Sequence, residues 1–210
     1  KSYNNQTMTW ELFWDVETKS WFSDTGNRDP GSLGVSVVSV YCRKLDDEFN
    51  QVDGKIQSFW EKDFDGMWKL FREVDRAIGF NSLQFDVPAM VPYAPADFTR
   101  LPHFDILDQI RSVNLGRGAS LNAIAKETLG RTKIDDGANA MLYWQAGDPQ
   151  SLATLQKYCE ADVLLTRDIY DFALKNGYLK FIDKWNNLRT VAVNFSYPKK
   201  LDQVKQSSLF

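Results

Sequence analysis

The stretch "LFWDVETKSW", residues 12 to 21, carries the clearest structural signal in the sequence. Its first five residues are apolar or aromatic around a single acid, which predicts a central, buried β-strand. Asp15 and Glu17 are two residues apart, so both carboxylates point to the same face of that strand. Two like charges placed side by side in a buried position are costly unless a positive group joins them. The stretch therefore predicts a strand that carries a cation-binding site.

Two more strands and several helices are expected after this one. Leu33 to Lys44 alternates and is rich in β-branched residues, and Lys55 to Asp63 continues the pattern, which predicts an antiparallel meander of three strands. Further elements are predicted as a helix at 64–77, strands at 77–82 and 103–110, a short helix near Pro88, a helix from Ser120 to Gly130, a long helix from Pro149 to Gly177, and a hairpin over 178–195. This order predicts an α/β fold with a mixed central sheet and helices on both faces.

The bulk composition limits the classes of protein to consider. A chain of 210 residues with 43% hydrophobic and 14% aromatic content is long enough for one well-packed domain. We expect a single domain over 1–210, with a core at about 10–182 and a hairpin and polar tail at 183–210. The net charge of −3 gives no sign of a strongly basic nucleic-acid binder. It does not exclude one, because bound metal cations supply their own positive charge.

The cysteines and the apolar runs indicate the cellular setting. Cys42 and Cys159 form neither a disulfide framework nor a zinc-ligand spacing, which favours a reducing, intracellular and cytoplasmic location. No apolar run is long enough for a membrane span, so no membrane partner is expected. The chain begins without Met, and we interpret it as a trimmed chain or a fragment of a longer protein.

Other acids occur where predicted elements meet. Asp86 lies at a strand-to-helix junction, and Tyr158 and Asp162 are four residues apart in the long helix, so they share one of its faces. With Asp15 and Glu17 they form a candidate cluster of four acids. Hard divalent cations with oxygen ligands neutralise such a cluster, which predicts Mg²⁺ or Mn²⁺. Two such ions roughly 4 Å apart clamp the attacking and leaving oxygens of a phosphodiester, and the tyrosine could orient or deprotonate the attacking water.

Three motifs in this order resemble those of the DEDD superfamily of 3′-to-5′ exonucleases, which have a ribonuclease H-like fold. "WDVET" (14–18) resembles the first motif, Asp-x-Glu. "GFNSLQFDVP" (79–88) resembles the second motif in the form that proofreading domains of B-family DNA polymerases carry. "YCEAD" (158–162) resembles the third motif in its Tyr-x-x-x-Asp version, the DEDDy branch. "SLNAIAKETLGRTKIDDG" (120–137) resembles the Leu-rich helix and LG-x-x-K stretch between the second and third motifs, and the whole resemblance covers about residues 10 to 180.

The resemblance implies a role for each matching residue in the catalytic and metal-binding site. Asp15, Glu17 and Asp162 would hold the ion nearer the nucleophile, and Asp15 would also bridge to a second ion that Asp86 supports. Tyr158 would position the hydrolytic water.

The resemblance also implies a substrate. Thr18 at the end of the first motif, together with Asn81 and Gln84 in the second, would contact it, although Asn is usual at the position of Gln84. The implied activity is a metal-dependent 3′-5′ exonuclease that acts on single-stranded DNA and releases 5′-mononucleotides. A ribonuclease D-like RNA exonuclease uses the same chemistry and remains an alternative, as does an inactive nucleic-acid-binding module.

Plain structural interpretations stand beside these. Asp15 and Glu17 could face solvent at a strand edge, but the nearby aromatic residues favour partial burial. These residues are Phe13, Trp14, Trp21 and Phe22. Asp162 could be a solvated helix residue and Tyr158 a core aromatic. His103, the only histidine, lies far upstream of the third motif and is expected to be structural.

Overall fold

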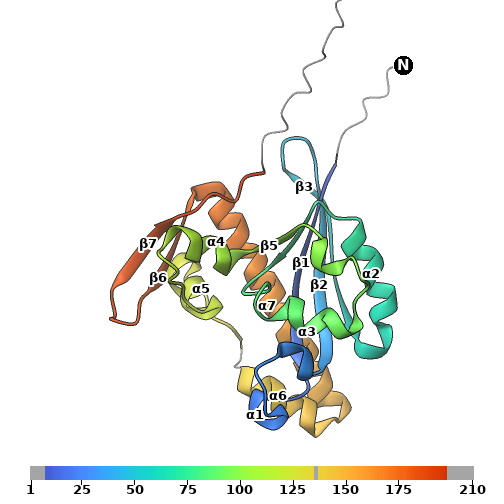
Figure 1. Cartoon of the computed structure of the whole chain (residues 1–210). Helices are drawn as coiled ribbons and strands as arrows, with labels where there is room; N and C mark the ends of the chain where they lie inside the picture. The colour runs from blue at the N-terminus through green and yellow to red at the C-terminus, as the bar shows by residue number, and fades with distance from the viewer. Residues whose placement is uncertain (1–7, 135–136, 198–210) are drawn as a thin grey trace, which may run out of the picture.

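A computed structural model of the chain describes residues 8–134 and 137–197 (Figure 1). The part of the predicted polar tail beyond residue 197 lies outside the described residues. In chain order the elements are β1 Thr9–Thr18, α1 Phe22–Thr25, η1 Pro30–Ser32, β2 Val35–Leu45, β3 Gln51–Trp60, η2 Glu61–Asp63, α2 Phe64–Arg72, β4 Arg76–Gly79, α3 Asp86–Met90, η3 Val91–Tyr93, η4 Phe98–Arg100, β5 His103–Asp105, α4 Ile106–Val113, α5 Leu121–Leu129, α6 Gly137–Ala146, α7 Pro149–Asn176, β6 Tyr178–Ile182 and β7 Leu188–Ala192. No helix in this described part is long and apolar enough to cross a membrane.

Five strands form one mixed sheet in the order β3-β2-β1-β4-β5. β1, β2 and β3 pair in antiparallel fashion, which confirms the predicted meander. β4 joins β1 in parallel and β5 joins β4 in parallel, so the chain must cross over between them. β1 is the middle strand of the sheet and therefore has a neighbouring strand on each side.

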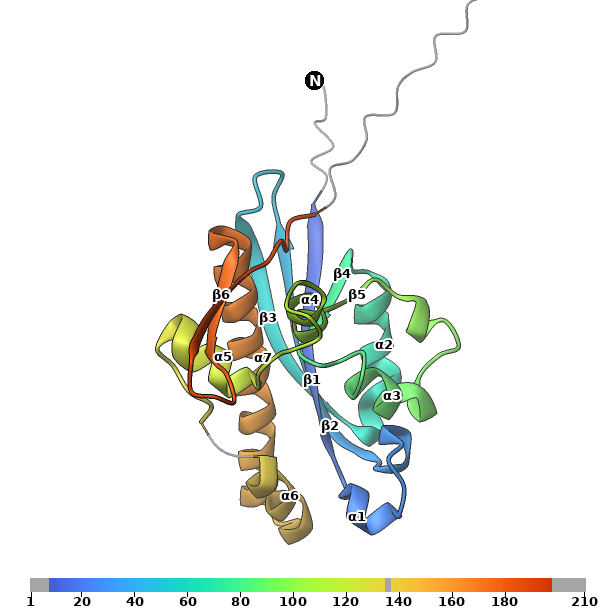
Figure 2. The same ribbon diagram turned by 60° about the vertical axis from the view of Figure 1, so that its left-hand side comes forward.

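The alternation of side chains along β1 divides the core in two. Leu12, Trp14 and Val16 pack against α2 and α3 on one face of the sheet. Phe13 lies on the other face, in a cluster with residues of α4, α5, α7 and the β6–β7 hairpin. Figure 2 shows α7 running along this second face, with α2 and α3 on the opposite side. Helices on both faces confirm the predicted α/β fold class.

The predicted strand at 103–110 is wrong beyond its third residue. The Asp105 carboxylate accepts hydrogen bonds from the backbone amides of Leu107 and Asp108, at 2.9 and 3.2 Å. It therefore caps the N-terminus of α4 and ends β5. β3 also begins and ends earlier than the predicted 55–63, because η2 follows it directly.

Glycines end two helices where the sequence predicts. Gly130 and Gly177 have φ angles of +66° and +75°, the left-handed conformation that closes a helix with little strain in glycine. At the start of α5, the Ser120 hydroxyl accepts a hydrogen bond from the amide of Ala123 at 3.2 Å. β6 begins at Tyr178, immediately after the long helix, so the hairpin starts inside the 10–182 range expected for the core.

Candidate active site and metal centre

Three segments that are distant in sequence bring four acids to one cavity of about 200 Å³. Asp15 and Glu17 come from the carboxyl end of β1, Asp86 from the first residue of α3, and Tyr158 and Asp162 from the middle of α7. The other lining residues are Val16, Phe80, Asn81, Phe85 and Lys133. All five residues for which catalytic roles are expected therefore line the same cavity.

The position of each acid follows from local structure. The Asp86 carboxylate accepts a hydrogen bond from the backbone amide of Val16 at 3.1 Å, which ties α3 to β1. Tyr158 and Asp162 lie one turn apart on the inward face of α7, with exposed fractions of 2% and 3%. Asp162 is therefore not a solvated helix residue.

Asp15 and Glu17 are partly buried, but the residues that bury them differ from those expected. Trp21 and Phe22 are 42% and 38% exposed, so the aromatic residues that follow the motif do not bury the acids. α7 lies against this face of β1 instead. Its Cys159 thiol donates to the backbone oxygen of Asp15 at 3.5 Å and contacts the carboxylate at 3.9 Å.

The acids raise one another's pKa values. Burial raises the pKa of Asp15 well above its ordinary value, and the charges of Asp86, Asp162 and Glu17 raise it further. Burial, with repulsion from Asp162, raises the pKa of Glu17 to about 8. Burial raises the pKa of Asp86 to about 7, against the opposing effect of its backbone hydrogen bonds. The folded chain thus disfavours the charged form of these acids unless cations are present.

Lys133 also lines the cavity, and the sequence assigned no role to it. Its ammonium forms an ion pair with Asp162 and donates a hydrogen bond to the Tyr158 hydroxyl at 2.8 Å. Burial lowers the pKa of Lys133, but the charges of Asp162 and Asp15 outweigh that effect and hold it above the ordinary range. Lys133 is the lysine of the LG-x-x-K stretch, which is the sequence feature that could have indicated its place in the cavity.

The chemistry of the donors fits a hard divalent cation. Ligand atoms of Asp15, Glu17 and Cys159 lie within 4.8 Å of one another. Burial raises the pKa of the Cys159 thiol well above its ordinary value, so the sulfur remains protonated and the available donors are carboxylate oxygens. The Oδ1 atom of Asp162 is buried and has no hydrogen-bond partner among the described residues. A buried carboxylate oxygen without a hydrogen-bond partner needs an explanation, and in a cavity lined by acids a bound cation would supply it.

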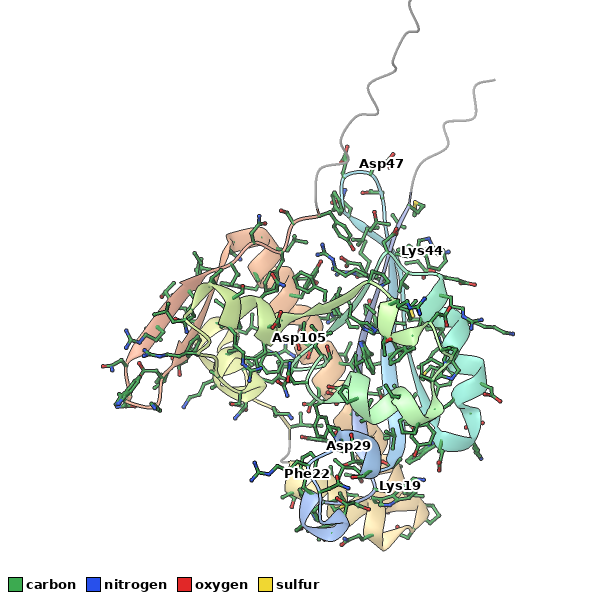
Figure 3. All side chains as sticks on the ribbon, viewed as in Figure 1. Lys19, Phe22, Asp29, Lys44, Asp47 and Asp105 are labelled. Atoms are coloured by element: carbon green, nitrogen blue, oxygen red, sulfur yellow. The ribbon has the colours of Figure 1, made fainter. Side chains whose placement is uncertain are left out.

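Of the three residues expected to bind substrate, one lines the cavity. Asn81 does so with a φ angle of +61°, and its backbone amide donates to Asp105 at 2.8 Å. Figure 3 shows Asp105 near the middle of the molecule, where it fixes this turn. Thr18 and Gln84 do not line the cavity; the Thr18 hydroxyl contacts the backbone oxygen of Ser20 at 3.4 Å, and Gln84 is exposed.

His103 has a structural position, as expected. Its Nε2 atom is 2.9 Å from the backbone oxygen of Phe98, and its ring packs against Trp14 and Phe98. These contacts lie on the face of the sheet opposite Asp15. The histidine therefore belongs to the core beneath α2 and α3.

The comparison with protein families matches residues 12–174, which span all three motifs, to the RNase H superfamily. The chain belongs to the RNase H superfamily. Among solved structures, this RNase H-superfamily chain is similar to the zinc-ion-bound form of the E. coli ExoI–ssDNA complex. The two sequences are 16% identical and the TM-score is 0.44. The match covers 80% of this chain and 41% of the other, so the chain spans less than half of that protein. No curated protein matches the sequence.

Proposed function

We propose that the protein is a divalent-metal-dependent 3′-5′ exonuclease of the DEDDy type, which hydrolyses single-stranded DNA from its 3′ end and releases 5′-mononucleotides. One observation carries the proposal: four acids and Tyr158, from three segments, line a single cavity. Membership of the RNase H superfamily supports hydrolysis of a nucleic-acid backbone, because the site lies within the matched region.

The proposed cofactors are two Mg²⁺ or Mn²⁺ ions. Asp15, Glu17 and Asp162 would hold one ion, and Asp15 and Asp86 the other. Bound there, the ions would stabilise the charge that develops on the attacking and leaving oxygens of the phosphodiester. The unpartnered Oδ1 of Asp162 supports this assignment, as do the pKa values of Asp15 and Glu17, which burial raises first and the neighbouring acids raise further.

Tyr158 would orient the attacking water. Lys133 donates to the Tyr158 oxygen, and the Tyr158 hydroxyl in turn is in hydrogen-bonding reach of the Asp162 carboxylate, which places the phenol directly beside a proposed metal ligand. Burial raises the pKa of Tyr158 above its ordinary value, so the phenol stays protonated near neutral pH. These two features favour an orienting role for Tyr158 over proton abstraction. Asn81 would contact the terminal nucleotide from the cavity wall, and Thr18 and Gln84 would contact the strand outside it.

Two alternatives to a DNA exonuclease are distinguished by the experiment described below. A ribonuclease D-like enzyme would use the same acids on RNA. An inactive nucleic-acid-binding module has no use for a buried carboxylate oxygen without a partner, and Asp162 carries one. That observation favours an active enzyme.

The test compares linear and circular single strands and single-stranded DNA and RNA. Oligonucleotides labelled at the 5′ end should give a descending ladder in Mn²⁺, with DNA shortened faster than RNA, and no products in EDTA. Cleavage of a circular single strand as fast as a linear one would show an endonuclease. Faster digestion of RNA would select the ribonuclease D-like alternative, and full activity in EDTA would exclude the metal assignment.

A further inference from the structure

Three hollows in the described part of the molecule form a series in which each shares lining residues with the next. The catalytic cavity shares Phe80 and Asn81 with a second hollow of about 600 Å³ beside α4 and the start of α5. The second hollow shares Gly118 with a third of about 430 Å³, which reaches Trp185 in the turn of the β6–β7 hairpin. Because neighbouring hollows have wall residues in common, an extended polymer ligand could pass from the catalytic acids to the hairpin. We call this path the hairpin groove.

The far end of the hairpin groove combines an exposed aromatic ring with cations. Trp185 is 55% exposed, which leaves part of its ring free for a ligand. The Arg117 guanidinium lies 5.4 Å from the ring centroid, and the Lys184 ammonium lies 4.5 Å from it. Arg117 belongs to the loop between α4 and α5, so two separate segments build this end of the groove.

The charge at this end is available to a ligand. Arg189 also lines the third hollow, but its guanidinium pairs with Asp183 at 2.6 Å. Within residues 8–134 and 137–197, neither Arg117 nor Lys184 forms an ion pair. The whole chain carries a net charge of −3, so unpaired positive charge at this position is a local feature.

We propose that the hairpin groove binds the upstream part of the single strand whose 3′ end lies at the catalytic acids. Trp185 stacks on a base, and Arg117 and Lys184 bind the flanking phosphates. Aromatic stacking beside cations is how proteins hold single strands without reading their sequence. The inference rests on the proposed function and adds to it a second contact region, so that affinity depends on substrate length.

A protein partner is the rival occupant of this surface. The continuity with the catalytic cavity argues for the nucleic acid, because a strand that leaves the acids meets the second hollow next. Arg111 in that second hollow adds a guanidinium to the path, and it donates to the Asn81 side chain at 3.2 Å. Cations therefore occur along the groove as well as at its end.

The experiment measures binding of fluorescent dT4 and dT16 by anisotropy, with EDTA present to prevent cleavage, over a series of salt concentrations. The wild-type protein should bind dT16 more tightly than dT4. Trp185→Ala should lower the affinity for dT16 by about fivefold to a hundredfold, the usual range for one lost stacking contact. Trp185→Phe keeps a ring and should retain most of that affinity.

The two cations are tested through the salt dependence. The Arg117→Ala/Lys184→Ala double variant should lower the slope of log affinity against log salt by about 1.4, because each phosphate contact with a single strand contributes about 0.7. The matched control, Lys55→Ala/Lys62→Ala, removes the same charge from β3 and η2 at the opposite edge of the sheet. It should leave the slope unchanged.

The outcomes separate the groove from the proposed function. Unchanged dT16 binding by Trp185→Ala, equal losses for dT4 and dT16, or an equal effect of the control pair would each overturn the groove assignment. Exonuclease activity on dT16 with Mn²⁺ is measured beside the binding. Cleavage by a protein whose binding ignores Trp185 would leave the proposed function standing and remove the groove, whereas length-dependent binding without any cleavage would do the reverse. Wild-type protein that binds neither oligonucleotide would leave this surface to a protein partner.

Discussion

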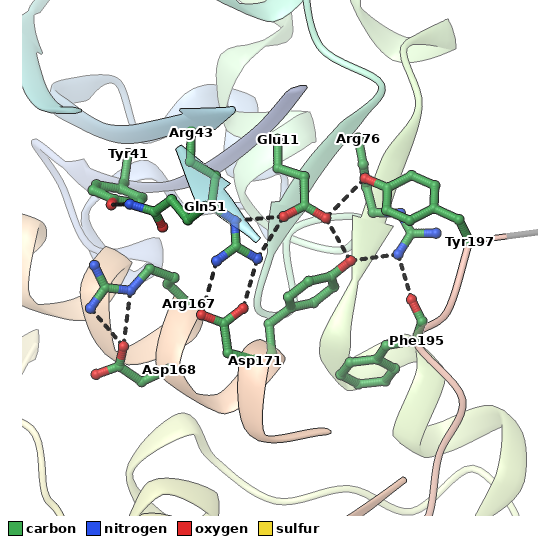
Figure 4. A network of polar contacts seen from close by, with 11 residues as sticks. Glu11, Tyr41, Arg43, Gln51, Arg76, Arg167, Asp168, Asp171, Phe195 and Tyr197 are labelled. Atoms are coloured by element: carbon green, nitrogen blue, oxygen red, sulfur yellow. Dashed lines mark hydrogen bonds and ion pairs between the residues drawn. The ribbon is translucent and has the colours of Figure 1, made fainter. Parts of the chain in front are cut away.

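Two acidic regions lie on the same face of β1, one around Glu11 and the other around Asp15 and Glu17. They differ in how far cations and hydrogen-bond donors balance the negative charge. Glu11, at the start of the strand, is fully buried. One of its carboxylate oxygens accepts hydrogen bonds from the hydroxyls of Tyr170 and Tyr197, both at 2.9 Å. The other accepts from the Arg43 guanidinium at 2.7 Å. Figure 4 shows this network, in which every oxygen of Glu11 has a partner.

The network extends across the core and fixes the end of the described chain. Arg43 also makes two hydrogen bonds to Asp171 on α7, at 2.9 and 2.7 Å. Arg76 donates to the Tyr170 hydroxyl at 2.6 Å and to the backbone oxygen of Phe195 at 2.7 Å. These contacts attach the segment after β7 to the sheet, which places the hairpin beside α4 and α5.

The region at the other end of β1 has four acids and one lysine. Asp162 has an oxygen without a hydrogen-bond partner among the described residues, and burial together with the neighbouring acids raises the pKa of Asp15. Burial of an acid therefore does not by itself indicate function. A buried acid with matched oxygens is part of the scaffold, whereas an excess of buried acids over cations indicates that a ligand completes the region.

The largest expected effect is on turnover. Asp15→Ala or Asp162→Ala should remove nearly all exonuclease activity, by on the order of 10³-fold or more, because metal stabilisation of the transition state is worth several kcal/mol. Single-turnover cleavage in Mn²⁺ measures this, with a melting curve to show that each variant folds. Substantial activity in either variant would break the contrast between the two regions.

The second effect is on stability, and it concerns the balanced region. Glu11→Ala should lower the free energy of unfolding by about 3 kcal/mol, the lower end of the range for a broken buried ion pair, because Arg43 loses its buried partner but keeps Asp171. Urea unfolding measures the loss. Asp15→Ala is the matched comparison, and it should cost far less because it relieves repulsion. A similar loss of stability in both variants would mean that the two regions do not differ as described.

The third effect separates Tyr158 from the acids. Tyr158→Phe should lower kcat by at least about tenfold, because it removes the hydroxyl that we propose orients the water. Its Mn²⁺ affinity should stay close to that of the wild type, since the phenol is not a ligand. Asp162→Ala should weaken Mn²⁺ binding as well as turnover. A phenylalanine variant with wild-type kcat would place Tyr158 in the core and remove support for the DEDDy assignment.

The smallest effect is the pH dependence of the metal-free protein. The pKa of Glu17 is raised to about 8 and that of Asp86 to about 7, so the folded state holds protons that the unfolded state has released. Stability that is present near pH 4 should therefore fall as the pH rises toward 8. In EDTA, Tm should drop by about 2–4 °C for each kcal/mol lost over this range. Tm that rises from pH 5 to pH 8 in EDTA would contradict these pKa shifts.

Sequence signals that act over a few neighbouring residues predicted several of the helices and strands correctly. The β-branched run of β2, the Ser120 cap and the glycines after α5 and α7 each act over a few residues, and the structure has them where expected. The strand predicted at 103–110 was wrong after its third residue because the apolar residues there suit a strand or a helix. The Asp105 cap starts a helix at Ile106. Such a cap is visible in sequence only when the strand before it is known to be short.

The site was predicted as a set of acids, but its balance of charge was not. The motif spacings identified Asp15, Glu17, Asp86, Tyr158 and Asp162, and all five line the cavity. Lys133 and the Glu11 network depend on contacts between distant segments, which periodicity does not encode. For the same reason no role was predicted for Glu11, although it lies four residues before Asp15 in the same strand.

Thermal melting with and without Mn²⁺ shows directly whether the acids around Asp15 bind divalent cations. Saturating Mn²⁺ should raise Tm of the wild-type protein at pH 7.5, because a ligand that binds only the folded state stabilises it by mass action. Asp15→Ala should show little or no rise, while its own Tm in EDTA is no lower than that of the wild type. An unchanged wild-type Tm in Mn²⁺, or an equal rise in Asp15→Ala, would contradict the account.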